Sequence, residues 1–452
     1  MNPAGSQNDA DSRSGASEPR PTEMRRSTEG MIRADSEFRT RLEHLTADAA
    51  PTIAANAADP GGPTPADTLL ARIVWARLVE PGDAIAGGLV GALGPVRALD
   101  LVASNTPIGR VRDLVHAASG AEPDPAELAR AFARWRLRLD RSATIADLER
   151  GLEAQMRIIT PESEHWPSAL ADLGDHAPLA LWVRGDHTLL ARFSLAVVGA
   201  RACTGYGSHI TAELTESVCE TGTTIISGAA YGVDAVAHRT ALALGAPTVA
   251  VLAGGADRPY PSSHGPLLER ISESGAVCSE MVPGSAPTRW RFLQRNRSIA
   301  ALARATLVTE AGVRSGSLNT AGHAAELGRA LGAVPGPVTS AASAGCHRLL
   351  REYGATLVTN GAEVREFLGL SNDPALFEAE TPETARQPAR HRRVLDALPL
   401  RGGRTAMEAA RRAGLDVADT RFALAELELL GAVARRETPG AAECHWVLLR
   451  RQ

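Results

Sequence analysis

Hydrophobic residues recur at three- and four-residue spacing from about residue 64 to residue 150. The segments DTLLARIVWARL and AELARAFARWRLRL each place their apolar residues on one face of a helix. Pro81-Gly82 and Gly94-Pro95 interrupt this pattern, since both dipeptides are typical of turns. The pattern therefore predicts a small helical domain over residues 64–150.

Between residues 194 and 370 short apolar runs alternate with amphipathic segments. The runs predict strands at 195–200, 223–228, 248–255, 276–281, 305–311 and 355–358, and the segments predict helices at 207–220, 231–244, 264–273, 292–303 and 317–331. Such alternation builds right-handed crossovers and a parallel sheet that is covered on both faces. We therefore expect an α/β core domain over residues 151–370, with a Rossmann-like, doubly wound, mostly parallel sheet. Ligands of such sheets bind beyond the carboxyl ends of the strands.

The two ends of the chain and one internal segment differ from this core. Residues 1–63 are rich in Ser, Ala, Pro, Asp and Glu, with few aromatic residues, and are expected to be a disordered tail. Residues 371–389 have the composition of a linker. Residues 390–452 predict helices near 391–397, 404–413 and 418–430, followed by the strand-like runs GAVARRE and CHWVLL. Three helices and a hairpin suggest a C-terminal winged helix.

Composition excludes several classes of enzyme. All 48 basic residues are arginine, because the sequence contains no lysine. A Walker A phosphate loop, a Schiff-base enzyme and a protein kinase each need a lysine. An anion bound by this protein therefore meets guanidinium, backbone N–H or hydroxyl groups.

Other whole-chain features predict where the protein works. The net charge of −4 is small for this length, so the overall charge of the protein does not indicate whether its binding partner is acidic or basic. The five cysteines form no CxxC pair, as expected for reduced thiols rather than a zinc or redox site. The N-terminus lacks the apolar segment of a signal peptide, and no apolar run reaches 18 residues. We expect a cytoplasmic protein with no membrane partner.

The end of the first predicted strand carries the first candidate site residues, Gly199 and Arg201. Glycine permits a close approach of backbone to a ligand, and the following helix offers free N–H groups to an anion. The glycines at 199, 205 and 207 do not form the GxGxxG fingerprint, which disfavours NAD. Arg201 either meets a phosphate or simply caps a surface turn.

The next two strands lead into further candidate loops. After the second strand the candidates are Ser227, Gly228, Tyr231 and Gly232. Asp234 and His238 lie four residues apart on one helix face. They form either an acid–base dyad or a structural pair. We favour the structural pair, because no nucleophile and no metal-ligand spacing accompanies them. Tyr260 lies between two prolines, where it either stacks on a base or wedges the loop.

Arginines are concentrated between residues 284 and 351. This stretch contains nine arginines and only two acidic residues, a local charge of +7. The cluster is either a solvated face or an anion-binding site at the strand ends, and we favour the anion-binding site. Because the arginines are spread over several loops, a polyanion fits them better than a single nucleotide does. The candidate phosphate-binding residues here are Arg295, Asn296, Arg297, Arg314, Ser315, Gly316, Ser317 and Thr320.

Five long motifs follow one another along the core: VVGARACTGYG, ISGAAYGVDAVAH, VLAGGADRPYP, SEMVPGSAPTRWRFLQRNRSIAALA and LVTEAGVRSGSLNTAGHAAELGRALGAVPG. Together with the lead-in at 157–186, they resemble the DNA-processing protein A family, also called DprA or Smf, over about residues 157–360. The segment 79–99 resembles the helix-hairpin-helix modules of some relatives, and the C-terminal segment resembles the winged helix that is common in the family.

The resemblance implies a non-enzymatic protein without a cofactor or a metal. It would bind single-stranded DNA regardless of sequence, load RecA onto the strand in DNA uptake and recombination, and act as a homodimer. Arg201 matches the arginine of the family's first glycine motif. The second motif commonly has a lysine where this chain has Tyr231, so a phosphate contact is lost there and stacking on a base can replace it.

Two rival functions remain open at this point. A nucleotide phosphoribohydrolase of the lysine-decarboxylase-like (LOG) type would use a PGGxGTxxE loop, but alignment of that loop with residues 315–320 places His323 where the catalytic glutamate belongs. A winged-helix transcription regulator would require tight duplex binding by residues 390–452.

Overall fold

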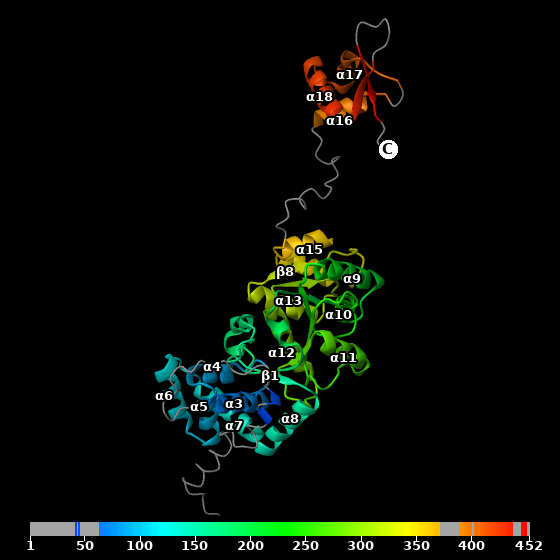
Figure 1. Cartoon of the computed structure of the whole chain (residues 1–452). Helices are drawn as coiled ribbons and strands as arrows, with labels where there is room; N and C mark the ends of the chain where they lie inside the picture. The colour runs from blue at the N-terminus through cyan, green and yellow to red at the C-terminus, as the bar shows by residue number, and fades with distance from the viewer. Residues whose placement is uncertain are drawn as a thin grey trace, which may run out of the picture. The chain divides into compact units, whose positions relative to one another are not determined.

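The computed structural model describes residues 41–42, 44–45, 63–370, 389–399, 402–436 and 444–449 (Figure 1). The chain divides into two compact units, residues 1–371 and 372–452, which are described separately. Nearly all of the predicted disordered tail at 1–63 and of the predicted linker at 371–389 lies outside the described residues.

Six helices lie between residues 63 and 156 of the larger unit. They are α3 (Pro65–Leu78), α4 (Ala84–Leu93), α5 (Pro95–Ala103), α6 (Ile108–Ser119), α7 (Pro125–Arg138) and α8 (Arg141–Glu153). The sequence fixes their starts, because Thr64, Asp83, Asp124 and Asp140 each accept a hydrogen bond from the first turn of the following helix. Their apolar faces meet around Trp75 and Trp135, whose rings pack edge to face with centroids 5.1 Å apart.

A nine-stranded mixed sheet follows. Its strands are β1 (Arg157–Ile159), β2 (Leu181–Gly185), β3 (Ser194–Val198), β4 (Thr224–Ser227), β5 (Thr248–Leu252), β6 (Ala276–Ser279), β7 (Ala305–Val308), β8 (Ala330–Ala333) and β9 (Thr356–Leu357). The spatial order is β1-β2-β6-β5-β4-β3-β7-β8-β9. The pairs β1–β2 and β2–β6 are antiparallel, and every other pair is parallel. The sheet is thus largely parallel, with an antiparallel edge.

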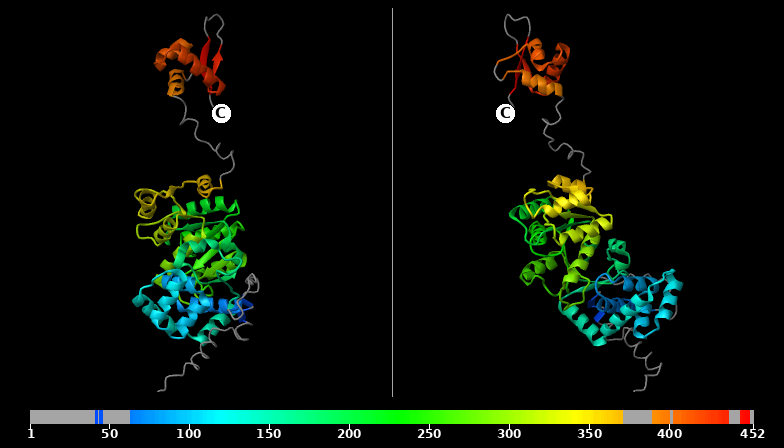
Figure 2. Two further views of the ribbon diagram at one scale, coloured as in Figure 1. Left: turned by 90° about the vertical axis from the view of Figure 1, so that its left-hand side faces the viewer. Right: turned by 180° about the vertical axis from the view of Figure 1, so that it is seen from behind.

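Helices cover both faces of this sheet (Figure 2). Alternate residues of β3 show the division: Leu195 and Val197 pack in one apolar cluster, and Ala196 packs in another. The first face carries α9 (Gly205–Cys219), α10 (Val233–Ala243), α11 (Gly265–Ser274) and α15 (Gly361–Phe367). The second carries α12 (Arg289–Leu302), α13 (Ser317–Glu326) and α14 (Ala344–Glu352), together with the short helices η1 (Ser168–His176) and η2 (His187–Ala191).

Two sequence-based expectations about the elements differ from the structure. The helix expected at 317–331 ends at Glu326; Gly328 then adopts a φ of 64°, which favours glycine, and β8 begins at Ala330. The antiparallel edge strands β1 and β2 were not expected, because their apolar runs are short and lie before the first alternating segment.

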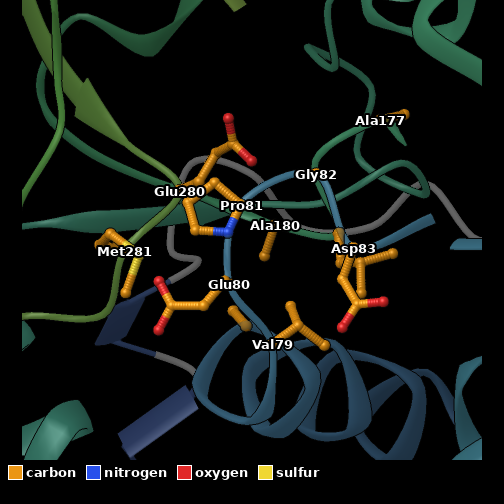
Figure 3. A pocket seen from close by; sticks show the side chains of 11 residues that line it. Val79, Glu80, Pro81, Gly82, Asp83, Ala177, Ala180, Glu280 and Met281 are labelled. Atoms are coloured by element: carbon orange, nitrogen blue, oxygen red, sulfur yellow. The ribbon is translucent and has the colours of Figure 1, made fainter. Parts of the chain in front are cut away.

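The helical region, predicted as a small domain of its own, shares an apolar cluster with the sheet. One apolar cluster contains residues of the helices together with Trp182 of β2 and Val277 of β6. The connection from α3 to α4, with Pro81 and Gly82, lies against Ala180 and the end of β6 (Figure 3). Sequence alone suggested a boundary near residue 150, since the periodicity changes there, but burial continues across it.

Gly151 of α8 offers a test of this shared core. A Cβ atom built there would lie 2.6 Å from Cζ3 of Trp182, so Gly151→Ala should lower the free energy of unfolding by about 1–3 kcal/mol. The matched control is Gly91→Ala in α4, where a Cβ atom meets nothing within 4 Å; there alanine should raise stability by up to about 1 kcal/mol. Urea unfolding measures both, and a stabilised Gly151→Ala would show that the helices do not pack on β2 as described.

The smaller unit contains α16 (Ala389–Ala397), α17 (Ala406–Ala413) and α18 (Val417–Leu429), followed by the antiparallel pair β10 (Val433–Arg436) and β11 (His445–Leu448). Its core includes Val394, Leu424, Leu427 and Trp446. Thr405 and Glu408 form a capping box at the start of α17. The unit therefore has an apolar core of its own.

No single helix among those that the structure describes is long and apolar enough to cross a bilayer. Helices α4 and α5 reach that length only as a pair, with a bend of 114° between them.

Candidate nucleic-acid interface

A pocket of about 580 Å³ opens at the carboxyl ends of β3 and β7. The chain leaves β3 toward β4 on one side, whereas β7 and β8 continue the sheet on the other side. The loops after β3 and β7 therefore diverge, which is where doubly wound sheets bind ligands. We call this the switch-point pocket; its lining includes Gly199, Arg201, Asp234, Phe292, Leu293, Arg295, Asn296, Arg314, Ser315, Gly316, Ser317 and Thr320.

Two exposed arginines lie at this pocket, Arg201 after β3 and Arg314 after β7. Neither has an ion-pair partner among the described residues. The guanidinium carbon of Arg201 lies 5.0 Å from the centroid of the Phe292 ring, which holds the cation over the ring face. Both charges are therefore available to an anionic ligand.

The start of α13 forms the wall next to Arg314. Gly316 is the N-cap and contributes no side-chain hydrogen bond to the first turn. The hydroxyls of Ser315 and Ser317 lie 2.7 Å apart, and Thr320 is buried one turn further along. The backbone N–H of Ser317 donates to the Ser315 hydroxyl at 3.4 Å, so a phosphate here would meet the hydroxyls, the positive end of the helix dipole and two guanidinium groups.

Arg295 lies under the pocket and is only 6% exposed. Its Nη1 donates to the carbonyl oxygen of Gly228, at 2.8 Å, and to that of Val251. Burial lowers the pKa of this guanidinium to about 10, although the nearby carboxylate of Asp234 opposes the shift. Arg295 therefore holds the ends of β4 and β5 together, and the structure gives it a role in shaping the floor.

Asp234 and Asn296 complete the floor of the pocket. Burial raises the pKa of Asp234, despite Arg295 and the N–H groups of Gly228 and Ala230, which donate to its carboxylate at 3.2 and 3.3 Å. Asn296 donates to Oδ1 of Asn319 at 3.1 Å and thereby ties α12 to α13. These contacts fix the loops that carry the exposed arginines.

The side chain of Arg297 was expected to face a ligand, but the structure places it in the interior. It is 3% exposed, and its guanidinium forms two hydrogen bonds of 2.6 and 2.7 Å with the carboxylate of Glu280. Two residues along a helix turn the side chain by about 200° from Arg295, so Arg297 points away from the switch-point pocket. Ser227 also differs from its expectation, because its buried hydroxyl donates to the carbonyl oxygen of Val197 at 2.6 Å.

The predicted aromatic residues lie beyond the lining of the pocket, on the side of β4 and β5. The Tyr260 ring lies 5.3 Å from that of Phe292, and the Tyr231 hydroxyl is 2.7 Å from that of Ser263. Both tyrosines are 48% exposed. Gly232, with a φ of 75°, approaches the Ala200 carbonyl so closely that a Cβ atom would lie 2.2 Å from the oxygen.

Several residues of this region were missed by the sequence analysis. Phe292 and Leu293 line the pocket one turn before Arg295 and Asn296, a three-residue spacing that was available in the sequence. Glu310 is buried and accepts hydrogen bonds of 2.7 Å from the backbone N–H and the hydroxyl of Thr204. It anchors the loop after β3, and only the parallel pairing of β3 with β7 reveals that role.

Asp234 and His238 do not form a dyad. His238 is fully buried, and its Nδ1 lies 2.7 Å from the hydroxyl of Thr248. Burial, assisted by Arg295, lowers the pKa of His238 to about 3. The group is thus a neutral structural histidine.

Acid should destabilise the protein through His238. Between pH 6.5 and about 3 the unfolded histidine binds a proton that the folded one does not, so stability falls as pH falls, with a slope of up to about 1.4 kcal/mol per pH unit from this group. His238→Gln lacks this contribution. Urea unfolding at pH 7 and pH 5 should show a smaller loss for the variant than for the wild type, and equal losses would contradict the assignment.

The described residues do not place the groups needed for hydrolysis or for metal binding at the switch-point pocket. His323 lies 3.2 Å from Glu326 and does not line the switch-point pocket. In the part of the chain that the structure describes, no group of three or more His, Cys, Asp or Glu residues could hold a metal ion.

Comparisons with known proteins relate this chain to one family. The family model for DNA recombination-mediator protein A matches residues 157–369. The putative DNA processing protein DprA of Mycobacterium tuberculosis strain H37Rv is 42% identical over 396 residues, which cover 83% of this chain and 94% of that protein. The protein Smf of Escherichia coli K12 is 37% identical over 65% of this chain and 78% of its own length.

A solved structure also matches. The X-ray structure of DNA processing protein A from Streptococcus pneumoniae superimposes with a TM-score of 0.53 at 31% identity, covering 65% of this chain and 95% of that one. Two of these relatives are named DNA processing protein A or DprA, and the third is named Smf. The family is DNA-binding and non-catalytic. On this combined similarity in sequence and fold, the chain belongs to the DprA (Smf) family of DNA-processing proteins.

Proposed function

We propose that this protein binds single-stranded DNA, without preference for sequence, at the switch-point pocket. The observation that carries the proposal is the pair Arg201 and Arg314: both are exposed, both lie at one pocket, and neither has an ion-pair partner among the described residues. Guanidinium groups and the start of α13 bind phosphates, which every nucleotide carries.

The neighbouring aromatic rings favour a single strand over a duplex. Tyr260 packs beside Phe292, whose ring lies under the Arg201 guanidinium, and about half of the Tyr260 surface is exposed. Exposed rings can stack with unpaired bases of any type, whereas paired bases in a duplex are already stacked. Phosphate contacts and stacking together give affinity without base recognition.

The wider role that we propose follows the description of the family as DNA recombination mediators. The protein would act as a cytoplasmic homodimer and load RecA onto the bound strand in recombination and DNA uptake. We further propose that α16–α18 and the β10–β11 pair form a winged helix that assists this role, since three short helices followed by an antiparallel hairpin are the parts of that motif.

Fluorescence anisotropy with labelled oligonucleotides tests the proposed binding. The full chain is titrated with single strands of different sequence and with a duplex, at low and at high salt. We expect similar affinity for each single strand, weaker binding of the duplex, and a fall of log K with log salt concentration of about 0.7 per phosphate contacted. Binding that ignores salt, or that prefers the duplex, would refute the proposal.

A further inference from the structure

A second pocket, of about 490 Å³, lies between the helical region and the start of α12. Its walls are the connection from α3 to α4, the end of α7 and the indole of Trp290. We call it the α7–α12 groove. The connection from α3 to α4, which forms the wall at Pro81, packs against Ala180 and the end of β6 (Figure 3).

Large apolar side chains are exposed at this groove, and no element among the described residues covers them. Trp290, in the first turn of α12, is 57% exposed, and Leu137, near the end of α7, is 89% exposed. An exposed indole and an exposed leucine on the two sides of a groove form a surface on which a flat apolar ring can lie.

The charges around the groove favour an anionic partner. Its carboxylates are neutralised internally: Glu80 is held by Arg291 and Arg138, and Asp83 by Arg134. Burial acts to raise the pKa of Glu80, but the hydrogen bonds from the two arginines outweigh it and lower the pKa. Because Arg291 and Arg138 share the single carboxylate of Glu80, one positive charge at the groove is left without a negative partner.

Arg289, the residue before Trp290, carries a positive charge at the start of α12. It is exposed at the first position of α12, and it has no ion-pair partner among the described residues. A guanidinium next to an exposed indole suits a nucleotide, whose phosphate meets the cation while its base stacks on the ring.

The groove continues the switch-point pocket along one helix. Trp290 borders the groove, and Leu293 lines the switch-point pocket. These residues are three apart in α12, so their positions lie less than one turn, about 4.5 Å, apart along the helix axis. A strand bound at the first pocket can therefore enter the second without a change of direction across the protein.

We propose that the α7–α12 groove is a second binding subsite for the same DNA strand, in which an unpaired base stacks on Trp290 and a phosphate meets Arg289. The helical region thereby takes part directly in strand binding. This inference rests on the proposed function, because it extends a strand that is already held at Arg201 and Arg314.

The test compares two lengths of oligothymidine, about four and about sixteen nucleotides, on full-length variants. Trp290→Ala should weaken binding of the long strand roughly 10- to 100-fold and leave the short strand nearly unaffected. Trp290→Phe, which keeps a ring, should recover most of the loss. The matched control is Phe193→Ala, which removes another exposed ring, 42% exposed, from just before β3 at the opposite edge of the sheet.

The outcomes separate this inference from the proposed function. If Trp290→Ala binds both lengths as the wild type does, the subsite is wrong, while loss of both lengths in Arg201→Ala still supports the switch-point pocket. If Trp290→Ala weakens both lengths equally, the groove is no separate subsite and the inference is overturned. If the wild type binds neither length, the proposed function fails, and the inference fails with it.

Discussion

Replacing Arg201 and Arg314 together by alanine should weaken the binding of single-stranded DNA by at least roughly 100-fold. A hydrogen bond to a charged group contributes about 1.5–3 kcal/mol, and each arginine is expected to supply at least one to a phosphate. The slope of log K against log salt concentration should fall by about 1.4, because two phosphate contacts are lost. The melting temperature should stay near that of the wild type, since both side chains are exposed and without ion-pair partners among the described residues.

The matched control lies at the other ends of the same two strands. Arg192 precedes β3 and Arg304 precedes β7, and both are exposed. The variant with alanine at both of these positions removes the same charge from the protein, but away from the switch-point pocket. Its affinity for DNA should fall far less. Equal losses in the two double variants would mean that net charge, and not this pocket, governs binding.

The second large effect concerns the ion pair of Arg297 with Glu280. Both side chains are almost wholly buried, with 4% and 10% of their surfaces exposed, and their closest approach is 2.6 Å. Arg297→Ala leaves the Glu280 carboxylate without its charged partner, so we expect the free energy of unfolding to fall by about 3–5 kcal/mol. Urea unfolding measures the loss.

A double variant separates this structural role from a role in DNA binding. Arg297→Met combined with Glu280→Leu replaces the pair by apolar side chains and should recover much of the lost stability, as is common for buried pairs. Its DNA affinity at low temperature should match that of the wild type, because Arg297 does not line the switch-point pocket. A stable Arg297→Ala protein that has lost DNA binding would instead place this residue at the ligand.

The sequence predicted those strands whose residues are buried on both faces. The run at 195–200 covers all of β3 but its first residue, and the runs at 223–228 and 305–311 contain β4 and β7, because a central parallel strand needs a continuous apolar run. The short edge strands β1 and β2 carry too little of that pattern. The predicted division near residue 150 stays a prediction, since a change in periodicity shows a change of element but not where a core ends, and one apolar cluster contains residues from both sides.

The chemistry that we propose for the site follows from features of the sequence, whereas the structure decides which residues can take part. The absence of lysine, the arginine-rich segment and the glycine loops at strand ends are properties of the sequence, and they suffice to predict anion binding by arginine at the edge of a parallel sheet. Which arginine is free to bind is a different question, since it depends on residues far away in the chain.

Tertiary contacts decided that question for the three arginines of greatest interest. Arg295 is committed to carbonyl groups at the ends of β4 and β5, and Arg297 to Glu280, whereas Arg201 forms no ion pair with any residue that the structure describes. All three look alike in the sequence. The physical reason is that a guanidinium is neutralised or left available by the partners that folding brings within a few ångströms, and helical phase and strand order determine those partners.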